Sequence, residues 1–409
     1  MTDIRRYDLY SPEFRRHTHE TFAQMRAENP VFQQPGLDGK TPIWFVTSYA
    51  EIEQVLLDDR HFVRDPASIS PELAAQYGGG GGLEAMFNNH MLNRDGEAHR
   101  RLRSLVSKAF TPKMIQSLRP RIEQIATELL DRAAANGEME LVADYGFPLP
   151  ITVIAELLGI PLDNQENFRI WSNAIMRPAL TPEAQQEALG MMQQFGQYMQ
   201  QLVAERRQSP GQDLLSGLIH VQAEGDRLSQ EELFSMLFLL IVAGHETTVS
   251  LIGNATLALI QNPEARSALQ ADPSLIPNAI EELLRYDSPV ERTLTRFVAA
   301  DVELGGQQLK QGDLLIAILG SANRDEARFA DPALLDIHRR PNPHLAFGKG
   351  AHYCLGAPLA RLEGEIAIRA LFQRFPDLHL DIDPADLTWR DTPLFRALTR
   401  LPVRWGSSG

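Results

Sequence analysis

The sequence of 409 residues contains a single cysteine. A disulfide within the chain is therefore excluded, and so is any zinc or iron–sulfur site built from several thiolates. One cysteine fits a reducing compartment, and we expect a cytoplasmic protein. The residue itself, Cys354, is either an inert buried thiol or central to the chemistry of the protein.

Positive charge is also scarce. Lysine and arginine number 39 against 53 aspartates and glutamates, which gives a formal net charge of −14. Nucleic-acid binding depends on clustered positive charge, so we expect no nucleic acid as a partner. Any basic binding site must be local.

Long apolar runs are missing as well. No stretch approaches the ~18 consecutive apolar residues of a membrane span, and the first ten residues are polar and charged. The nearest candidate, Met236 to Gly244, runs directly into His245-Glu246-Thr247-Thr248. We expect a buried helix there and no membrane association.

Helical periodicity dominates what is present. The apolar positions from Ile122 to Ala133 predict a helix that ends near Asn136-Gly137. A second helix is predicted from the capping-box pair Ser229 and Glu232 to about residue 262. It is far longer than the mean helix of about 12 residues and apolar nearly all round, as in a helix through the centre of a domain. Further helices are predicted at 277–286 and 355–375.

Strand patterns are few and short. They fall at residues 43–47, 302–304, 314–319, 378–382 and 402–405. The weakly periodic segment 66–89, which contains Gly78 to Gly82, is interpreted as a loop, equally a plain surface insertion or a functional lid. No linker or repeat divides the chain. The expected fold is mainly α with small β-sheets, in a single domain over residues 1–409.

The cysteine lies in the segment Phe-Gly-Lys-Gly-Ala-His-Tyr-Cys-Leu-Gly, residues 347–356. Its glycines permit tight turns, and the residues that follow have strong helix character, so the sulfur is expected at a helix N-terminus. Free N–H groups and the helix dipole stabilise a thiolate there, as a nucleophile or a metal ligand requires. A plain buried thiol is the alternative.

This loop resembles the haem-binding signature of the cytochrome P-450 family, Phe-Gly-x-Gly-x-His-x-Cys-x-Gly, and matches it at every fixed position. The resemblance implies a long central helix over a buried haem b, with Cys354 as the axial thiolate ligand of the iron. It also implies that Phe347 packs near the sulfur and that His352 contacts a haem propionate. Thiolate ligation favours O–O cleavage, which points to oxygen activation. Alternatively, His352 is a solvent-facing loop residue.

Polar residues interrupt the long apolar helix at Ala243-Gly244-His245-Glu246-Thr247-Thr248. Such groups are costly in a core unless they are used. The segment resembles the oxygen-binding motif of the same family, which implies that Thr247 takes part in oxygen activation and that Glu246 supplies protons. The alternative is a helix kink in which the hydroxyl groups bond back to preceding carbonyls.

Two further patterns match the family. Glu282 and Arg285 fit its structural Glu-x-x-Arg motif, although alone this spacing is usually a solvated ion pair. His99 and Arg103, one helical turn apart, fit its pair of propionate partners, and Arg296 supplies a further cation. A surface position on a strand is the alternative for Arg296.

The resemblance also suggests a substrate pocket. Its expected lining is Phe87, Met91, Leu240, Ala243, Val290, Leu294 and Phe395. These are ordinary core residue types too. The apolar lining favours a hydrophobic substrate, although Glu291 and Arg292 could present charge to a polar end.

The early helix is unusually basic for an acidic chain. A solvated face is the default interpretation. The resemblance instead suggests that Arg100, Lys108 and Lys349 form a local docking patch for a ferredoxin or flavodoxin-type electron donor.

The family motifs occur in the expected order from His99 to Gly356. They imply a soluble bacterial haem-thiolate monooxygenase that inserts one atom of dioxygen into a hydrophobic small molecule, with electrons from NAD(P)H through separate proteins. A peroxygenase, a haem sensor and a cysteine-dependent hydrolase are the alternatives. The Glu246–Thr247 pair favours oxygen use, and His352 is poorly placed as a hydrolytic base for Cys354. The substrate itself cannot be read from the sequence.

Overall fold

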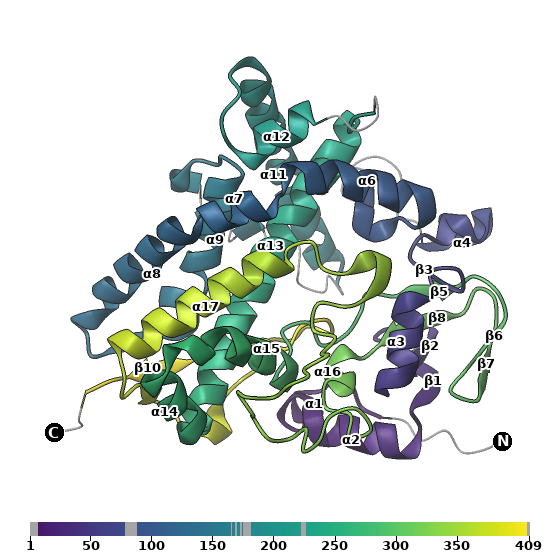
Figure 1. Cartoon of the computed structure of the whole chain (residues 1–409). Coiled ribbons are helices and arrows are strands. Elements are labelled where there is room, and N and C mark those ends of the chain that lie inside the picture. Colours follow the sequence, from purple (N-terminus) through teal and green to yellow (C-terminus); the bar gives the residue numbers. More distant parts are fainter. Residues whose placement is uncertain are drawn as a thin grey trace.

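The computed structural model describes residues 7–77, 88–164, 166–167, 170–171, 174, 181–221 and 226–406. Helices dominate it and three small sheets accompany them, which confirms the predicted mainly α fold (Figure 1).

The long helix α13, Gln230–Gln261, runs through the centre of the fold. Its predicted capping box is present: the Ser229 hydroxyl accepts the Glu232 N–H at 3.1 Å, and the Glu232 carboxylate accepts the Ser229 N–H at 2.8 Å. By length and composition α13 could cross a membrane, with a mean hydropathy of 1.6 over an 18-residue window. However, 61% of that window is buried inside the protein, as expected of a core helix.

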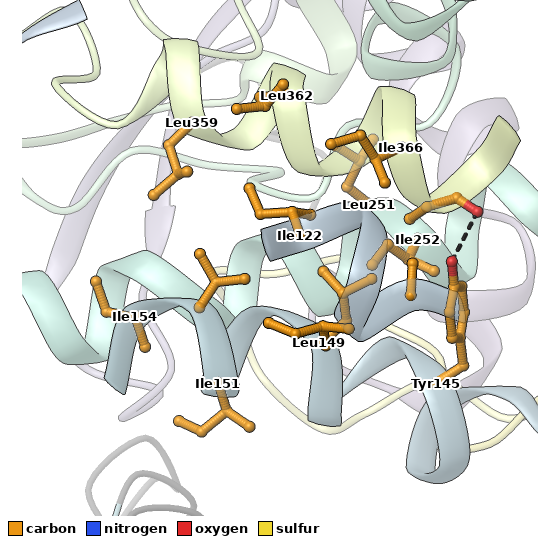
Figure 2. Close-up of a cluster of buried hydrophobic side chains, with 14 of the residues drawn as sticks. Ile122, Tyr145, Leu149, Ile151, Ile154, Leu251, Ile252, Leu359, Leu362 and Ile366 are labelled. Atoms are coloured by element: carbon orange, nitrogen blue, oxygen red, sulfur yellow. Dashed lines mark hydrogen bonds between the residues drawn. The ribbon is translucent and has the colours of Figure 1, made fainter. Parts of the chain in front are cut away.

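Helices α9 (Pro148–Leu157) and α17 (Ala357–Arg374) pack against α13, and α8 (Arg119–Ala134) packs against both of them. Together these helices form the main core. Figure 2 shows their apolar side chains meeting, with Ile122, Leu149, Leu251, Leu362 and Ile366 among them. The hydroxyl of Tyr145, in a short π-helical segment before α9, donates to the Ala367 carbonyl at 2.9 Å. This bond fixes α17 against the start of α9.

Two other predicted helices need only small changes of boundary. The helix expected at 277–286 is α15, Ile276–Tyr286, and the one expected at 355–375 is α17. Within the described residues, the remaining α-helices are α1 (Pro12–Arg16), α2 (Thr18–Glu28), α3 (Tyr49–Leu57), α4 (Pro71–Tyr77), α6 (Gly96–Ala109), α7 (Pro112–Ser117), α11 (Pro182–Gln208), α12 (Leu214–His220), α14 (Pro263–Ala271) and α16 (Leu319–Ala322).

Helix α4 lies inside the segment 66–89 that was interpreted as a loop, so this interpretation is wrong for residues 71–77. Pro71 fits the start of a helix, and Glu72 to Gln76 are good helix formers with too few apolar residues to give a strong periodicity. Gly78 to Gly82 lie outside the described residues.

The largest sheet has the strand order β1-β2-β8-β5-β3. Strands β2 and β8 are parallel, with Ile43 opposite Leu314, and the other neighbours are antiparallel. The bounds are β1 Val31–Pro35, β2 Pro42–Val46, β3 Phe62–Val63, β5 Arg296–Val298 and β8 Leu314–Ala317. The smaller sheets are β4-β10-β9 (Glu138–Glu140, Pro402–Arg404, His379–Leu380) and β6-β7 (Val302–Leu304, Gln307–Leu309).

All five predicted strands are present: 302–304 has the predicted bounds, as β6, and the other four are shorter or shifted. The segment 314–319 is the clearest difference, because the chain leaves β8 after Ala317 and enters α16 at Leu319.

Candidate active site

Cys354 lies in the turn that leads into α17. Its N–H donates to the Phe347 carbonyl at 3.0 Å and closes the loop. Gly348 and Gly350 adopt φ values of +68° and +73°, where side chains are disfavoured. A Cβ atom on Gly350 would lie only 2.4 Å from the Leu56 carbonyl oxygen at the end of α3. Glycine at 350 therefore allows the cysteine loop to pack directly against α3.

The surroundings of the sulfur shift the pKa of the Cys354 thiol in opposite directions. Burial raises the pKa of the Cys354 thiol, whereas N–H groups of Gly356 and Ala357 and the charges of Arg103 and Arg361 lower it. The net result is a raised pKa, so the expected helix-start stabilisation is present but burial outweighs it. A half-buried sulfur with converging N–H donors suits a thiolate whose charge is shared with a bound metal ion.

Arg361 supports the loop from α17, and sequence reasoning missed it. Its guanidinium carbon lies 4.5 Å from the centroid of the Phe347 ring. Glu281 of α15 holds this guanidinium with two contacts, at 2.6 and 2.8 Å. Phe347 is thereby fixed beside the cysteine turn.

One stripe in the middle of α13 is less buried than the second half of the helix. Leu240, Gly244 and Thr247 are half-buried and Ala243 is exposed. Spacings of three and four residues place all four on one helix face. An apolar, unburied face in the middle of a core helix marks where a bound group would be covered.

Thr247 and Glu246 are held by different partners. The Thr247 hydroxyl donates to the Ala243 carbonyl at 3.0 Å, as in the alternative interpretation, but α13 continues unbroken through this segment. The Glu246 carboxylate is buried, accepts a hydrogen bond from Arg390 and lies 3.4 Å from His245 Nε2. Burial acts to raise the pKa of Glu246, but hydrogen bonding and charge from His245 and then Arg390 lower it to about 2. Glu246 is therefore a buried, ionised acid.

The predicted propionate partners form a cluster. The His99 and His352 rings lie 4.2 Å apart between centroids, and His352 Nε2 is 3.4 Å from Asp95 Oδ1. Arg296 is buried and donates to the Phe62 carbonyl at 2.8 Å. The alternatives of a solvent-facing His352 and a surface Arg296 are therefore wrong. Asp95, the residue directly before α6, was not predicted as part of this cluster.

This cluster fits an anionic cofactor. Two of its buried atoms, His99 Nε2 and Arg296 Nε, have no hydrogen-bond partner. Burial, then the charges of His352 and Arg103, lower the pKa of His99 to about 4. Buried polar groups are normally satisfied, so these unpartnered nitrogens beside Arg103 suit the carboxylates of a haem.

Glu282 and Arg285 form a buried network rather than a solvated pair. Both side chains have 0% exposure, with contacts at 2.7 and 2.8 Å. Arg285 also donates to the Asn323, Pro332 and Leu334 carbonyls, and Glu282 accepts from Arg339. The pair ties α15 to the segment that precedes the cysteine loop.

The predicted pocket residues differ in burial. Met91 and Phe395 are buried, Leu240 and Val290 are half-buried, and Ala243 and Leu294 are exposed. Val290 and Phe395 face each other in an isolated β-bridge. Phe87 lies outside the described residues.

The prediction that Glu291 and Arg292 could present charge to the pocket is wrong. Both are buried and pair with each other at 2.9 Å, and Glu291 also binds Arg15 at 3.1 Å. Both side chains face the N-terminal segment, where Glu291 binds Arg15 of α1 and Arg292 donates to the Leu9 carbonyl at 2.9 Å.

Comparison with known proteins identifies the family. The sequence pattern described as "Cytochrome P450" matches residues 10–381. The chain belongs to the cytochrome P450 family. This P450 is 45% identical to cytochrome P450 107B1 of Saccharopolyspora erythraea over 97% of each chain. It is 41% identical to 6-deoxyerythronolide B hydroxylase of the same organism, over 97% of this chain and 98% of the relative.

Comparison with solved structures supports the same family. The myxobacterial cytochrome P450 CYP267B1, in complex with myristic acid, superposes with a TM-score of 0.92 at 38% identity, over 98% of this P450 and 99% of that chain. This P450 is accordingly a haem b oxidoreductase, a monooxygenase that acts on a small organic substrate. A sensor without turnover and a cysteine-dependent hydrolase are excluded.

Proposed function

We propose that Cys354 is the axial thiolate ligand of the haem iron in this monooxygenase. The observation that carries the proposal is the loop from Phe347 to the only cysteine, Cys354, together with the helix start that follows it, where the N–H groups of Gly356 and Ala357 approach the sulfur. Bound haem supplies the activation of dioxygen, and thiolate ligation favours O–O cleavage. The chain itself holds the sulfur, shields it from water and limits its charge.

His99, Arg103, Arg296 and His352 hold the propionates in this proposal. Two observations support this role: buried nitrogen atoms of His99 and Arg296 have no hydrogen-bond partner, and Arg103 lies close to the sulfur of Cys354. Glu282 and Arg285 act at a distance, because their buried network fixes the segment from which the cysteine loop emerges.

Glu246 and Thr247 handle protons. The Thr247 hydroxyl lies on the partly exposed stripe of α13. When the hydroxyl breaks its hydrogen bond to the Ala243 carbonyl, it can donate its proton to a reacting oxygen atom instead. Glu246, next along the helix, carries protons between solvent and that hydroxyl.

The variant Thr247→Ala tests this role. We expect electrons from NAD(P)H to be diverted to hydrogen peroxide, measured as peroxide formed per NAD(P)H consumed with a surrogate donor. Ser250→Ala is the matched control, because Ser250 makes the same type of back-bond, to the Glu246 carbonyl at 2.9 Å, but is buried. An unchanged peroxide yield in Thr247→Ala would remove Thr247 from the mechanism.

The substrate is a hydrophobic molecule that contacts Met91, Leu240, Ala243, Val290, Leu294 and Phe395. The exposed apolar side chains of Ala243 and Leu294 support this choice, and Leu294 is 40% exposed. Myristic acid is a suitable probe, since a similar structure holds it. Binding is measured as a change in the iron spin state, and a Leu294→Asp variant should weaken it.

A ferredoxin or flavodoxin-type donor docks at a patch that includes Arg100, Lys108 and Lys349. Arg100 and Lys108 are exposed on α6, while Lys349 is paired with Glu53. Reversal of charge in Arg100→Glu and Lys108→Glu should slow reduction by the donor and leave myristic acid binding unchanged. Lys310→Glu, on an exposed ion pair beside β7, is the control. Slower reduction in that control alone would contradict the assignment.

We also propose that residues 1–409 form one domain and that the enzyme works in the cytoplasm. The burial of α13 inside the fold supports a location away from a membrane.

A further inference from the structure

Arg390, the partner of Glu246, lies on a hairpin near the C-terminus, residues 389–398. Trp389 and Leu398 form a β-bridge, and the Arg390 N–H donates to the Ala397 carbonyl at 2.8 Å. The hairpin packs on α13, since a Cβ on Gly253 would lie 3.8 Å from Leu398 Cδ1. Arg390 is thereby placed beside the central helix.

The hairpin is firmly anchored on its other strand. The Arg396 guanidinium stacks on Trp389, with 3.6 Å to the ring centroid, and binds Asp287 at 2.6 Å. The neighbouring residue Phe395 forms the bridge with Val290 at the proposed pocket wall. Pocket wall and acid partner therefore belong to one rigid element.

The ion pair spans the boundary between core and solvent. The Glu246 side chain is 4% exposed and the Arg390 side chain 29%. The other group that faces Glu246 is His245 on its own helix. Glu363 of α17 lies nearby on the α13 face, hydrogen-bonded to Thr248, and burial raises its pKa well above the usual range, so it is protonated. Arg390 is the member of this set that reaches toward solvent.

We propose that Arg390 is a positioning residue for proton delivery, which holds the Glu246 carboxylate in an ion pair at the solvent side of α13. The hairpin that contributes Phe395 to the proposed pocket wall also places Arg390 for this role. The proposal rests on the proton-carrying role of Glu246 given above. Phe395 and Arg390 are five residues apart in one hairpin, so a single element carries both the proposed pocket wall and the partner of the acid.

The consequence of removing Arg390 follows from burial. A buried carboxylate that loses an ion-pair partner favours its neutral form, so the pKa of Glu246 rises. Each unit of that rise gives tenfold more protonated acid at a fixed pH. Arg390→Gln removes the charge, Arg390→Lys keeps it, and Arg390→Met provides a second neutral variant if the glutamine variant does not fold.

The test compares infrared spectra of the haem-loaded variants between pH 8 and pH 6, in the carboxylic-acid region. Arg390→Gln or Arg390→Met should gain a band that grows as pH falls and that is missing after additional Glu246→Gln. Arg390→Lys should match the wild type. Arg404→Gln is the matched control, because Arg404 pairs with the exposed Glu138 and Asp381 in the same C-terminal region. Protonated Glu363 should contribute a carboxylic-acid band to every spectrum, and the loss of that band in Glu363→Gln identifies it.

A second readout follows the reaction. Dithionite-reduced protein is mixed with dioxygen, and the return of the ferric spectrum is timed in each variant. At each pH between 8 and 6, the rate in Arg390→Gln should exceed the wild-type rate about tenfold per unit of pKa gained, while Arg404→Gln should match the wild type. A variant with the wild-type carbon monoxide spectrum but neither the new band nor the faster rate would overturn the role of Arg390. Absence of a thiolate-type spectrum from the wild type itself would instead contradict the proposed function.

Discussion

Replacement of Gly350 by alanine is expected to destabilise this P450 more than replacement of Gly348, two residues away. Both glycines have positive φ values, +68° at Gly348 and +73° at Gly350. Their surroundings differ: a Cβ on Gly348 would meet nothing within 4 Å, whereas a Cβ on Gly350 would lie 2.4 Å from the Leu56 carbonyl oxygen. The contact is with backbone, which cannot turn away as a flexible side chain can.

The magnitudes follow from these two differences. An alanine in the left-handed region costs roughly 1–2 kcal/mol, part of which is offset by about 0.4–1 kcal/mol from the loss of freedom in the unfolded chain. Gly348→Ala should therefore cost about 1 kcal/mol or less. Gly350→Ala carries an added overpacking cost of about 1–3 kcal/mol, because α3 or the cysteine loop must shift.

Urea unfolding of the haem-loaded proteins measures the difference as a change in midpoint at constant slope. The haem content of the purified variants gives an independent measure, since a displaced loop moves Cys354. Equal losses of unfolding free energy in the two variants would refute the steric argument, because the φ values alone predict equality.

Three further predictions concern buried charges. Glu282→Gln should lower the unfolding free energy by about 3–5 kcal/mol, because it leaves the buried Arg285 without its counter-charge; a loss below about 1 kcal/mol in urea unfolding would contradict this. Burial, then the charge of Arg324, lower the pKa of His19 to about 4 in the folded state. Between pH 6.5 and 4 the unfolded state therefore binds more protons than the folded state, and stability falls as the pH is lowered through that range. His19→Gln should weaken the fall in stability between pH 7 and pH 4.5 by up to the contribution of one proton, measured from urea midpoints at the two pH values. An identical fall in the variant would argue against a neutral His19 ring in the folded state. Burial raises the pKa of Glu363, so the folded state keeps a proton that the unfolded state loses above about pH 4.5, and stability declines as pH rises. Glu363→Gln should flatten this decline in thermal unfolding at pH 6 and 9, and a steeper decline would refute it.

Local patterns predicted much of the fold and part of the site. The start of α13 was predictable because Ser229 and Glu232 satisfy each other within one turn. The cysteine loop was predictable for a similar reason, since its motif is continuous along the chain. Its glycines, its closing bond and the helix that follows all involve neighbouring residues.

Partners far apart in sequence were not predictable. Arg390 lies 144 residues from Glu246, and no local pattern joins the two. The same is true of Glu53, which binds Lys349, and of Arg15, which binds Glu291. These pairs depend on which elements meet in the folded chain, as does the burial that raises the pKa of Cys354.

The central claim is the ligation of the haem iron by Cys354. The most direct measurement is the carbon monoxide difference spectrum of the dithionite-reduced wild type and of Cys354→Ser. Ligation by Cys354 predicts the red-shifted Soret band of a thiolate-bound haem in the wild type and its loss in the variant. A thiolate-type band that persists in Cys354→Ser, or well-folded wild-type protein that takes up no haem, would contradict the account.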